Sequence, residues 1–196
     1  MALPLLWLGA AALSAMAVKG LADDRKQMQK QRGNSYRAKT LLELDEYESP
    51  VACYPSDLFS FEEKVKPNIG SIVCCGIGGV LDHSGIWIGE NTIVELAGNG
   101  LVKAVSSERF IEERSGKHIF VACDSTAFAL GNDNVAENAI AQIYQYKDYH
   151  LIKNNCHQFI WDCFANNDKQ LTTLKSLSIA IAHYHNRVIY WDVCDC

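Results

Sequence analysis

Between residues 71 and 123, short runs of apolar and β-branched residues are separated by turn-forming residues, which predicts a small antiparallel sheet. The clearest pair of runs, 84–88 and 92–96, flanks Gly89-Glu90-Asn91 and is expected to form a hairpin. Further strands are expected at residues 71–75, 101–105 and 119–123.

Apolar residues with helical spacing predict helices around these strands. The expected helices span residues 107–114, 135–146, 154–164 and 171–182. Ser107 and the pair Asn154-Asn155 stand where an N-cap side chain would accept a hydrogen bond from the first turn. The predicted fold class is therefore α+β, with a small antiparallel sheet packed against helices and an apolar helix at the N-terminus.

The N-terminal apolar segment, residues 3–18, carries no charge and has two interpretations. A retained membrane anchor is slightly short of the ~20 residues that span a bilayer, but Leu21 and Ala22 extend it. Lys and Arg cluster after the segment, which favours an anchor with the domain in the cytoplasm. The alternative is export after cleavage of a signal peptide, which fits Ala15-Met16-Ala17.

The composition excludes two classes of protein. Of the 196 residues, 48% are hydrophobic and 21% are charged, which is typical of a globular chain rather than a disordered one. The net charge of -5, with no basic patch in the body of the chain, argues against a nucleic-acid partner.

The eight cysteines favour reduced thiols over a disulfide framework, because Cys74 and Cys75 are adjacent and Cys123 lies in an apolar run. No C-x-x-C pair is present. The nearest approach to a zinc ligand set is His183, His185, Cys194 and Cys196. Its spacing differs from that of the common zinc modules, so we expect neither a metal nor a cofactor.

Cys156 is the candidate nucleophile. It follows Asn154-Asn155, so it would lie in the first turn of a helix. There, unpaired backbone N–H groups and the helix dipole favour an anion and lower the pKa of a thiol. A buried structural cysteine is the alternative interpretation.

His83 and Glu95 are the candidates for a general base and the carboxylate that orients it. If Trp87 faces Asn91 across the hairpin, His83 and Glu95 lie directly opposite each other on one face of the sheet. Their β-carbons would then be about 5 Å apart. With Cys156 they would form a Cys–His–acid set. A structural histidine at a strand end and a solvated carboxylate are the alternatives.

Four segments, spread over about residues 61–165, carry a resemblance to a known family. They are KPNIGSIV at 66–73, DHSGIWIG at 82–89, IVEL at 93–96 and YHLIKNNCHQF at 149–159. In these motifs the chain resembles the lecithin retinol acyltransferase-like domain, a circularly permuted branch of the papain-like NlpC-type superfamily. Three positions depart from the family pattern: Glu95 stands where a second His or another polar residue is usual, and His157-Gln158 replaces Glu-His.

The resemblance implies a circularly permuted papain-like fold and a thiol-dependent acyltransferase or hydrolase that acts through a Cys acyl-enzyme. Cys156 would attack the carbonyl of a lipid acyl group, His83 would carry the proton, and Glu95 would orient the imidazole. Two alternatives stay open. One is a cysteine peptidase or amidase of the same scaffold that acts on cell wall or protein, and the other is a non-catalytic membrane-associated binding module.

The expected organisation has four parts. They are an anchor or signal segment at 1–22, a linker with a peripheral helix at 23–60, the acyltransferase-like catalytic domain at 61–165 and a C-terminal helical tail at 166–196. The expected partners are an acyl-containing or lipid substrate and, through the N-terminal segment, a membrane. Nothing in the sequence specifies an oligomeric state.

Overall fold

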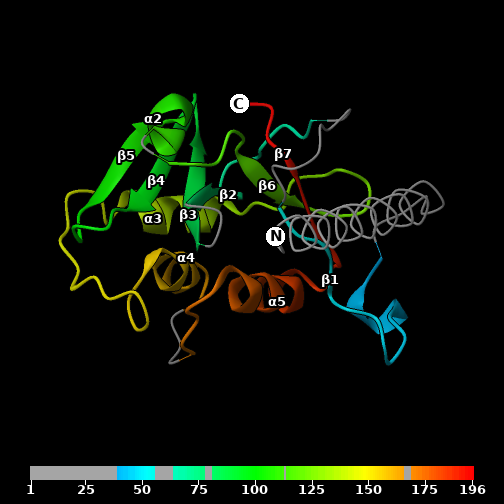
Figure 1. Cartoon of the computed structure of the whole chain (residues 1–196). Helices are drawn as coiled ribbons and strands as arrows, with labels where there is room; N and C mark the ends of the chain where they lie inside the picture. The colour runs from blue at the N-terminus through cyan, green and yellow to red at the C-terminus, as the bar shows by residue number, and fades with distance from the viewer. Residues whose placement is uncertain (1–38, 56–63, 78–80, 113, 166–168) are drawn as a thin grey trace, which may run out of the picture. The chain divides into compact units, whose positions relative to one another are not determined.

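In the computed structural model, seven strands form one sheet, shown in Figure 1. The strands are Val51–Cys53 (β1), Ile72–Ile77 (β2), Leu81–Gly89 (β3), Thr92–Leu96 (β4), Val102–Ser106 (β5), Phe120–Cys123 (β6) and Ile189–Val193 (β7). Their order in the sheet is β1-β7-β6-β2-β3-β4-β5. The structure describes residues 39–55, 64–77, 81–112, 114–165 and 169–196, all within one unit that spans 37–196.

The described helices are a 3-10 turn at Leu41–Glu43 (η1) and four α-helices, Ser107–Ile111 (α2), Asp133–Ile140 (α3), Cys156–Phe164 (α4) and Leu174–His185 (α5). The predicted α+β class is therefore confirmed. The apolar helix and anchor predicted at the N-terminus lie outside the described residues. Among the residues that are described, no helix is both long and apolar enough to cross a bilayer.

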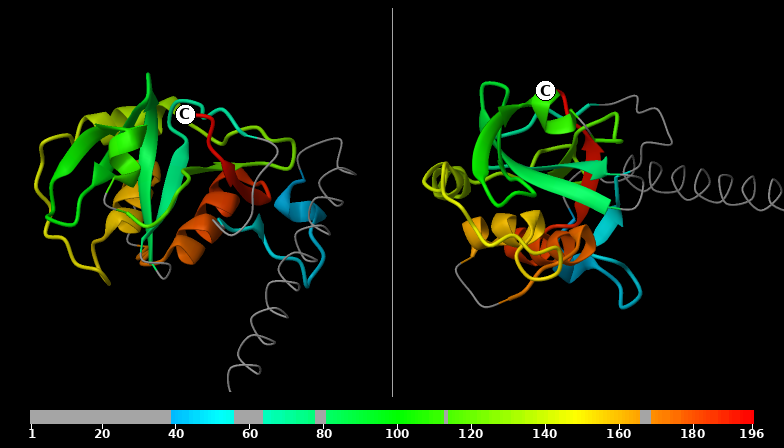
Figure 2. Two further views of the ribbon diagram at one scale, coloured as in Figure 1. Left: turned by 45° about the horizontal axis from the view of Figure 1, so that its top comes forward. Right: turned by 60° about the vertical axis from the view of Figure 1, so that its left-hand side comes forward.

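The sheet is buried on both faces because alternate residues of its central strands point to opposite sides. Ile72 and Cys74 belong to a core that they share with residues of α3, α4 and α5. Val73 and Cys75 belong to a second core that includes Phe110 of α2. Figures 1 and 2 show α4 and α5 against one side of the sheet and α2 on the other.

The five predicted strands are present as β2 to β6, whereas β1 and β7 were not predicted. These two strands pair in parallel, so the sheet is mixed and not purely antiparallel as expected. Residues 166–196 contribute both α5 and β7, and β7 lies between β1 and β6. The run of β-branched and aromatic residues at 188–191 is a strand signal that the sequence analysis did not use.

One local prediction needs correction. Ser106, not Ser107, is the N-cap of α2, and its side chain accepts a hydrogen bond from the Arg109 N–H.

Residues 151–153 form a turn, closed by a bridge between His150 and Asn154. This turn leads directly into the cap of α4.

The hairpin of β3 and β4 is present, but its predicted register is wrong by two residues. Trp87 pairs with Ile93 and not with Asn91. The loop contains only Glu90 and Asn91, whose φ angles of 47° and 55° are those of a two-residue turn, and a bulge precedes it at Trp87/Gly89. Since side chains alternate with a period of two, a shift of two residues keeps each side chain on its predicted face.

Candidate active site

The N-terminus of α4 is held in place by its cap residue, Asn155. The Asn155 Oδ1 accepts hydrogen bonds from the N–H groups of His157 (3.0 Å) and Gln158 (3.1 Å). Its Nδ2 donates to the carbonyl oxygens of Leu151 and Thr172, both at 2.8 Å. The cap thus joins the preceding turn, the helix and the segment before α5, and it fixes Cys156 as the first residue of the helix.

We expect Asn155→Ala to destabilise the protein by about 2 kcal/mol, because the variant loses a cap and leaves buried polar groups without partners. Urea unfolding of the full chain measures this loss. Asn132→Ala is the matched control, since the Asn132 side chain caps α3 through a single acceptor contact to the Asn134 N–H. If both variants lower the free energy of unfolding by the same amount, the buried Asn155 contacts do not stabilise the start of α4.

His83, from β3, is oriented by contacts on two sides of its ring. Its Nε2 lies 2.8 Å from the Glu95 Oε2, and its ring packs on Phe110 with centroids 5.3 Å apart. Ile86 pairs with Val94, which places Glu95 beside Gly85 and diagonally across from His83. A diagonal neighbour is within reach of a long side chain. Predicted site residues therefore meet even though the predicted pairing was wrong.

Gly85 provides the space that this arrangement needs. A β-carbon at this position would lie 2.5 Å from the Ile93 side chain and 2.9 Å from the Phe110 ring. Phe110 therefore lies over Gly85, where it packs against the imidazole.

Cys156 approaches His83 and Ser84 from the helix side. Cys156 is 3% exposed, and its sulfur is 4.0 Å from the Asp82 carbonyl oxygen. Burial raises the pKa of Cys156, but hydrogen bonds with His83 and with the backbone and side chain of Ser84 outweigh burial and lower the pKa below its ordinary value. Since the His83 Nε2 faces Glu95, Nδ1 is the ring nitrogen that remains for the thiol.

The pKa of His83 moves in the opposite direction to that of the thiol. Burial lowers the pKa of the imidazole, but hydrogen bonds with Cys156 and Glu95 outweigh burial and raise it above its ordinary value. A thiol with a lowered pKa beside an imidazole with a raised pKa favours transfer of the proton from sulfur to nitrogen. The pair can therefore exist as a thiolate and an imidazolium.

Glu95 is a buried carboxylate that contacts three basic side chains. It is 1% exposed, and besides His83 it contacts the Arg114 guanidinium at 2.9 Å and the Lys103 ammonium at 3.3 Å. Burial raises the pKa of Glu95, but the hydrogen bond and charge of His83 and those of Arg114 lower it to about 2. The carboxylate is therefore ionised throughout the neutral range and can stabilise an imidazolium.

Acid should destabilise the protein as Glu95 becomes protonated. Its pKa of about 2 in the folded state is below its ordinary value of 4.5, so the stability that it contributes is present above pH 4.5 and is lost as the pH falls toward 2. This shift in the pKa of Glu95 corresponds to about 3 kcal/mol in the free energy of unfolding. We expect the free energy of unfolding to fall over this range in the wild type and to fall less in Glu95→Gln, as measured by urea titration at several pH values. An equal fall in both proteins would contradict the assignment.

His157 and Gln158, which follow the thiol, do not hold the His83 ring through any hydrogen bond seen here. The His157 Nδ1 lies 3.0 Å from the Ser84 Oγ, and the Gln158 side chain accepts a hydrogen bond from the Leu171 N–H. Burial, helped by the charge of His83, lowers the pKa of His157 to about 4, so His157 is neutral at pH 7. Its contact with Ser84 supports the strand residue that hydrogen bonds the thiol.

The environment of Cys156 differs from that of Cys163, which lies on the same helix. Burial raises the pKa of Cys163 to about 12, so this thiol stays protonated. Tyr149 is close enough to Cys156 for the charge of the thiolate to raise its pKa, although burial is the larger cause. Two thiols on one helix thus have opposite chemistry because only one of them contacts an imidazole.

The structure brings together the three predicted site residues Cys156, His83 and Glu95. Three further residues of the site, Arg114, Lys103 and Ser84, were not predicted from the sequence. Lys103 could have been found from the strand pattern, because it pairs directly with Glu95 across β4 and β5. Arg114 follows α2 and has no comparable local signal.

In the part of the chain that the structure describes, no group of three or more His, Cys, Asp or Glu side chains is arranged to hold a metal ion. In comparisons with known proteins, the chain matches no protein-family model and no curated protein.

Proposed function

We propose that the protein is a thiol-dependent acyltransferase or hydrolase with Cys156 as its nucleophile. The observation that carries the proposal is the continuous contact from Cys156 through His83 to Glu95, with the pKa of the thiol lowered and that of the imidazole raised. This combination activates a nucleophile and is not needed for packing. The order of His on β3, acid on β4 and Cys on α4 is consistent with a circularly permuted papain-like arrangement.

In the proposed reaction, the Cys156 thiolate attacks the carbonyl carbon of an ester or amide, and the electron pair moves to the carbonyl oxygen. The N–H groups of His157 and Gln158 are already bound by Asn155, so the Cys156 N–H is the helix donor left to stabilise the oxyanion. The His83 imidazolium then protonates the leaving group, and a thioester remains on Cys156. Water or an acyl acceptor, deprotonated by His83, releases the acyl group.

We propose a lipid acyl group as the substrate. The turn before the cap exposes two large apolar side chains, Leu151 (64% exposed) and Ile152 (67% exposed), and the Leu151 carbonyl is bound to Asn155. An acyl chain would find apolar contact there, four to five residues before the nucleophile. The uncharged segment at 3–18 would hold the site near lipid if it anchors the chain.

The experiment that tests the proposal is the trapping of an acyl-enzyme. The full chain is incubated with dioleoylphosphatidylcholine vesicles or with a cell-wall tetrapeptide, quenched in acid and analysed by intact mass and peptide mapping. An oleoyl thioester on Cys156, absent from Cys156→Ala, would support the lipid reaction. A peptidyl adduct alone would favour the peptidase alternative, and no adduct or turnover with either substrate would contradict the proposal.

A further inference from the structure

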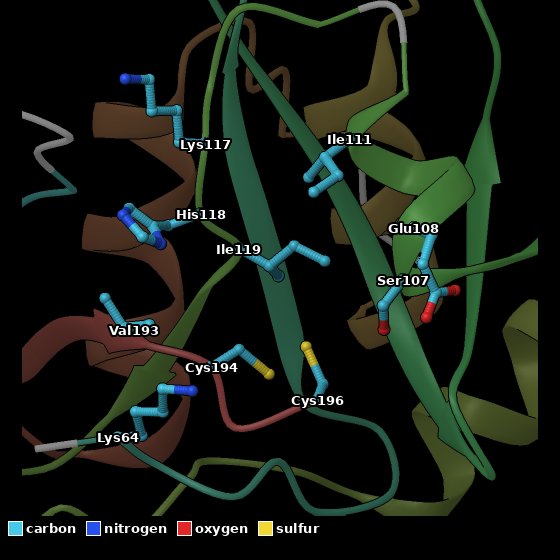
Figure 3. A pocket seen from close by; sticks show the side chains of 10 residues that line it. All are labelled: Lys64, Ser107, Glu108, Ile111, Lys117, His118, Ile119, Val193, Cys194 and Cys196. Carbon is cyan, nitrogen blue, oxygen red and sulfur yellow. The ribbon is translucent and has the colours of Figure 1, made fainter.

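Two thiols outside the candidate active site, those of Cys194 and Cys196, lie in a cavity. None of Cys156, His83 and Glu95 lines this cavity. The cavity, of about 360 Å³, is formed where β7 ends beside the start of α2. Cys194 and Cys196 line it together with Ser107, and three basic side chains, Lys64, Lys117 and His118, also border it (Figure 3). Figure 3 shows both cysteine side chains directed into the cavity, with their sulfur atoms facing each other.

The backbone fixes one of these thiols and leaves the other accessible. The Cys194 N–H donates to the Ile119 carbonyl at 2.7 Å, and the following Asp195 N–H donates to the Val65 carbonyl at 2.9 Å. Cys194 is buried, whereas Cys196 is exposed. Cys196 is therefore the more accessible of the two cysteines.

The cavity also contains a buried hydroxyl group, that of Ser107. The residue is buried, and its hydroxyl has no hydrogen-bond partner of standard geometry among the described residues. The hydroxyl nevertheless lies close enough to the Cys196 sulfur to lower the pKa of that thiol. A buried hydroxyl without a full partner is unusual, and a thiolate or a bound ligand in the cavity would satisfy it.

The two thiols differ in acidity. The hydrogen bond from Cys194, together with Ser107, lowers the pKa of Cys196 to about 7, against the opposing effects of burial and of the Asp195 and Glu108 carboxylates. The hydrogen bond to Cys196 and burial raise the pKa of Cys194. Lys64, which lies 3.9 Å from Asp195, offsets part of the nearby negative charge. At pH 7, about half of Cys196 is therefore thiolate, whereas Cys194 is the thiol.

This division matches the two roles in thiol–disulfide exchange. The best attacking thiol has a pKa near the ambient pH, because a less acidic thiol is mostly protonated and a more acidic one is a weaker nucleophile. Relative to a thiol with a pKa of ~8.5, a thiol with a pKa of ~7 should react about threefold faster at pH 7. The protonated partner would act second, after the first bond has formed.

We propose that Cys194 and Cys196 form a redox-active dithiol site that takes a low-molecular-weight disulfide as its substrate. The Cys196 thiolate attacks one sulfur of the disulfide, forms a mixed disulfide and releases one thiolate. Cys194 then loses its proton to that thiolate and attacks the Cys196 sulfur, which releases the second thiolate. The two cysteines lose two electrons and, because Cys196 reacts as a thiolate, one proton. The small disulfide gains both electrons and leaves as one thiol and one thiolate, and the thiolate takes a second proton from water.

The test uses the full chain in a Cys156→Ala background, so that the other activated thiol is absent and the outcome is independent of the proposed acyl chemistry. The protein is incubated with oxidised glutathione at pH 7, quenched with acid and mapped by mass spectrometry. We expect the C-terminal peptide to lose two hydrogens, as an intramolecular disulfide requires. With Cys194→Ser, Cys196 should instead accumulate as a glutathione mixed disulfide, and with Cys196→Ser neither product should form.

Two further variants separate the site from general thiol reactivity. Cys53→Ser, at a partly exposed cysteine on β1, is the matched control and should leave the C-terminal disulfide unchanged. Ser107→Ala should raise the pKa of Cys196, as measured from the pH dependence of its reaction with iodoacetamide. It should slow that reaction at pH 7 by less than the roughly threefold effect of the whole shift, because the hydrogen bond from Cys194 remains. The proposal is overturned if oxidised glutathione leaves the C-terminal peptide reduced, or if Cys194 forms the mixed disulfide in preference to Cys196.

Discussion

Cys156→Ala should abolish the thioester intermediate and lower kcat/KM by roughly a thousandfold or more, which is the order of loss when a nucleophile is removed from a catalytic triad. The physical reason is that the variant removes the thiol whose pKa the contacts with His83 and Ser84 lower, whereas Cys163, on the same helix, has a pKa raised to about 12. Steady-state hydrolysis of a chromogenic acyl ester, together with intact mass after an acid quench, measures both effects.

Cys163→Ala is the matched control for this prediction. It removes a buried sulfur from the same helix without touching His83. This variant should lose some stability but keep kcat/KM within a few-fold. Unchanged turnover in Cys156→Ala would exclude the proposed nucleophile, and a parallel loss of activity in both variants would point to damage of α4 rather than to chemistry.

Glu95→Gln should keep the fold and lower kcat/KM by roughly tenfold to a hundredfold. Glu95→Ala should lower kcat/KM further. The amide still accepts a hydrogen bond from the His83 ring, but it no longer supplies the charge that helps to raise the pKa of His83. The pKa of His83 falls, so the imidazolium loses its proton at lower pH. The alkaline limb of the kcat/KM profile should therefore move to lower pH.

Glu95→Ala should also destabilise the protein, by roughly 3 kcal/mol, because the partly buried Arg114 loses its carboxylate partner. Urea unfolding separates this loss from the catalytic effect, since the rate is measured well below the unfolding transition. Glu90→Gln is the matched control, because Glu90 is an exposed carboxylate at the tip of the same hairpin. If neither Glu95 variant changes the pH profile, Glu95 does not act on the imidazole.

The hairpin shows how far the sequence could predict the site. Side chains along a strand alternate between the two faces of the sheet, and this alternation correctly predicted that His83 and Glu95 share a face. The prediction depends only on whether the separation of the two residues across the turn is even or odd, not on the exact register. The direct pairing of the two residues was wrong, because a run such as Gly89-Glu90-Asn91 does not reveal which residues adopt positive φ. His83 and Glu95 are nevertheless in contact for two reasons. The register error of two residues equals the side-chain period of a strand, so both side chains stay on the same face, and a glutamate side chain is long enough to reach a diagonal neighbour.

The remaining partners of the site could not be read from local pattern. Arg114 contacts Glu95 from the segment after α2. Ser84 contacts His157, which lies on a helix more than seventy residues later in the chain. Such contacts depend on how the strands are ordered in the sheet, and periodicity carries no information about that order. The helix cap is the opposite case, because Asn155 acts mainly on its immediate neighbours and was found from the sequence.

The position of β7 has a consequence for how the chain folds. This strand pairs with β1 on one side and with β6 on the other, so β1 has no place in the sheet until residues 189–193 arrive. During synthesis, β2 to β5 can form from neighbouring segments, whereas β1 must wait for a strand made more than 130 residues later. Closing so long a loop is entropically costly and slow. We therefore expect the sheet to be completed only after translation of this last strand, with β1 and β6 open to chaperones or to other chains until then.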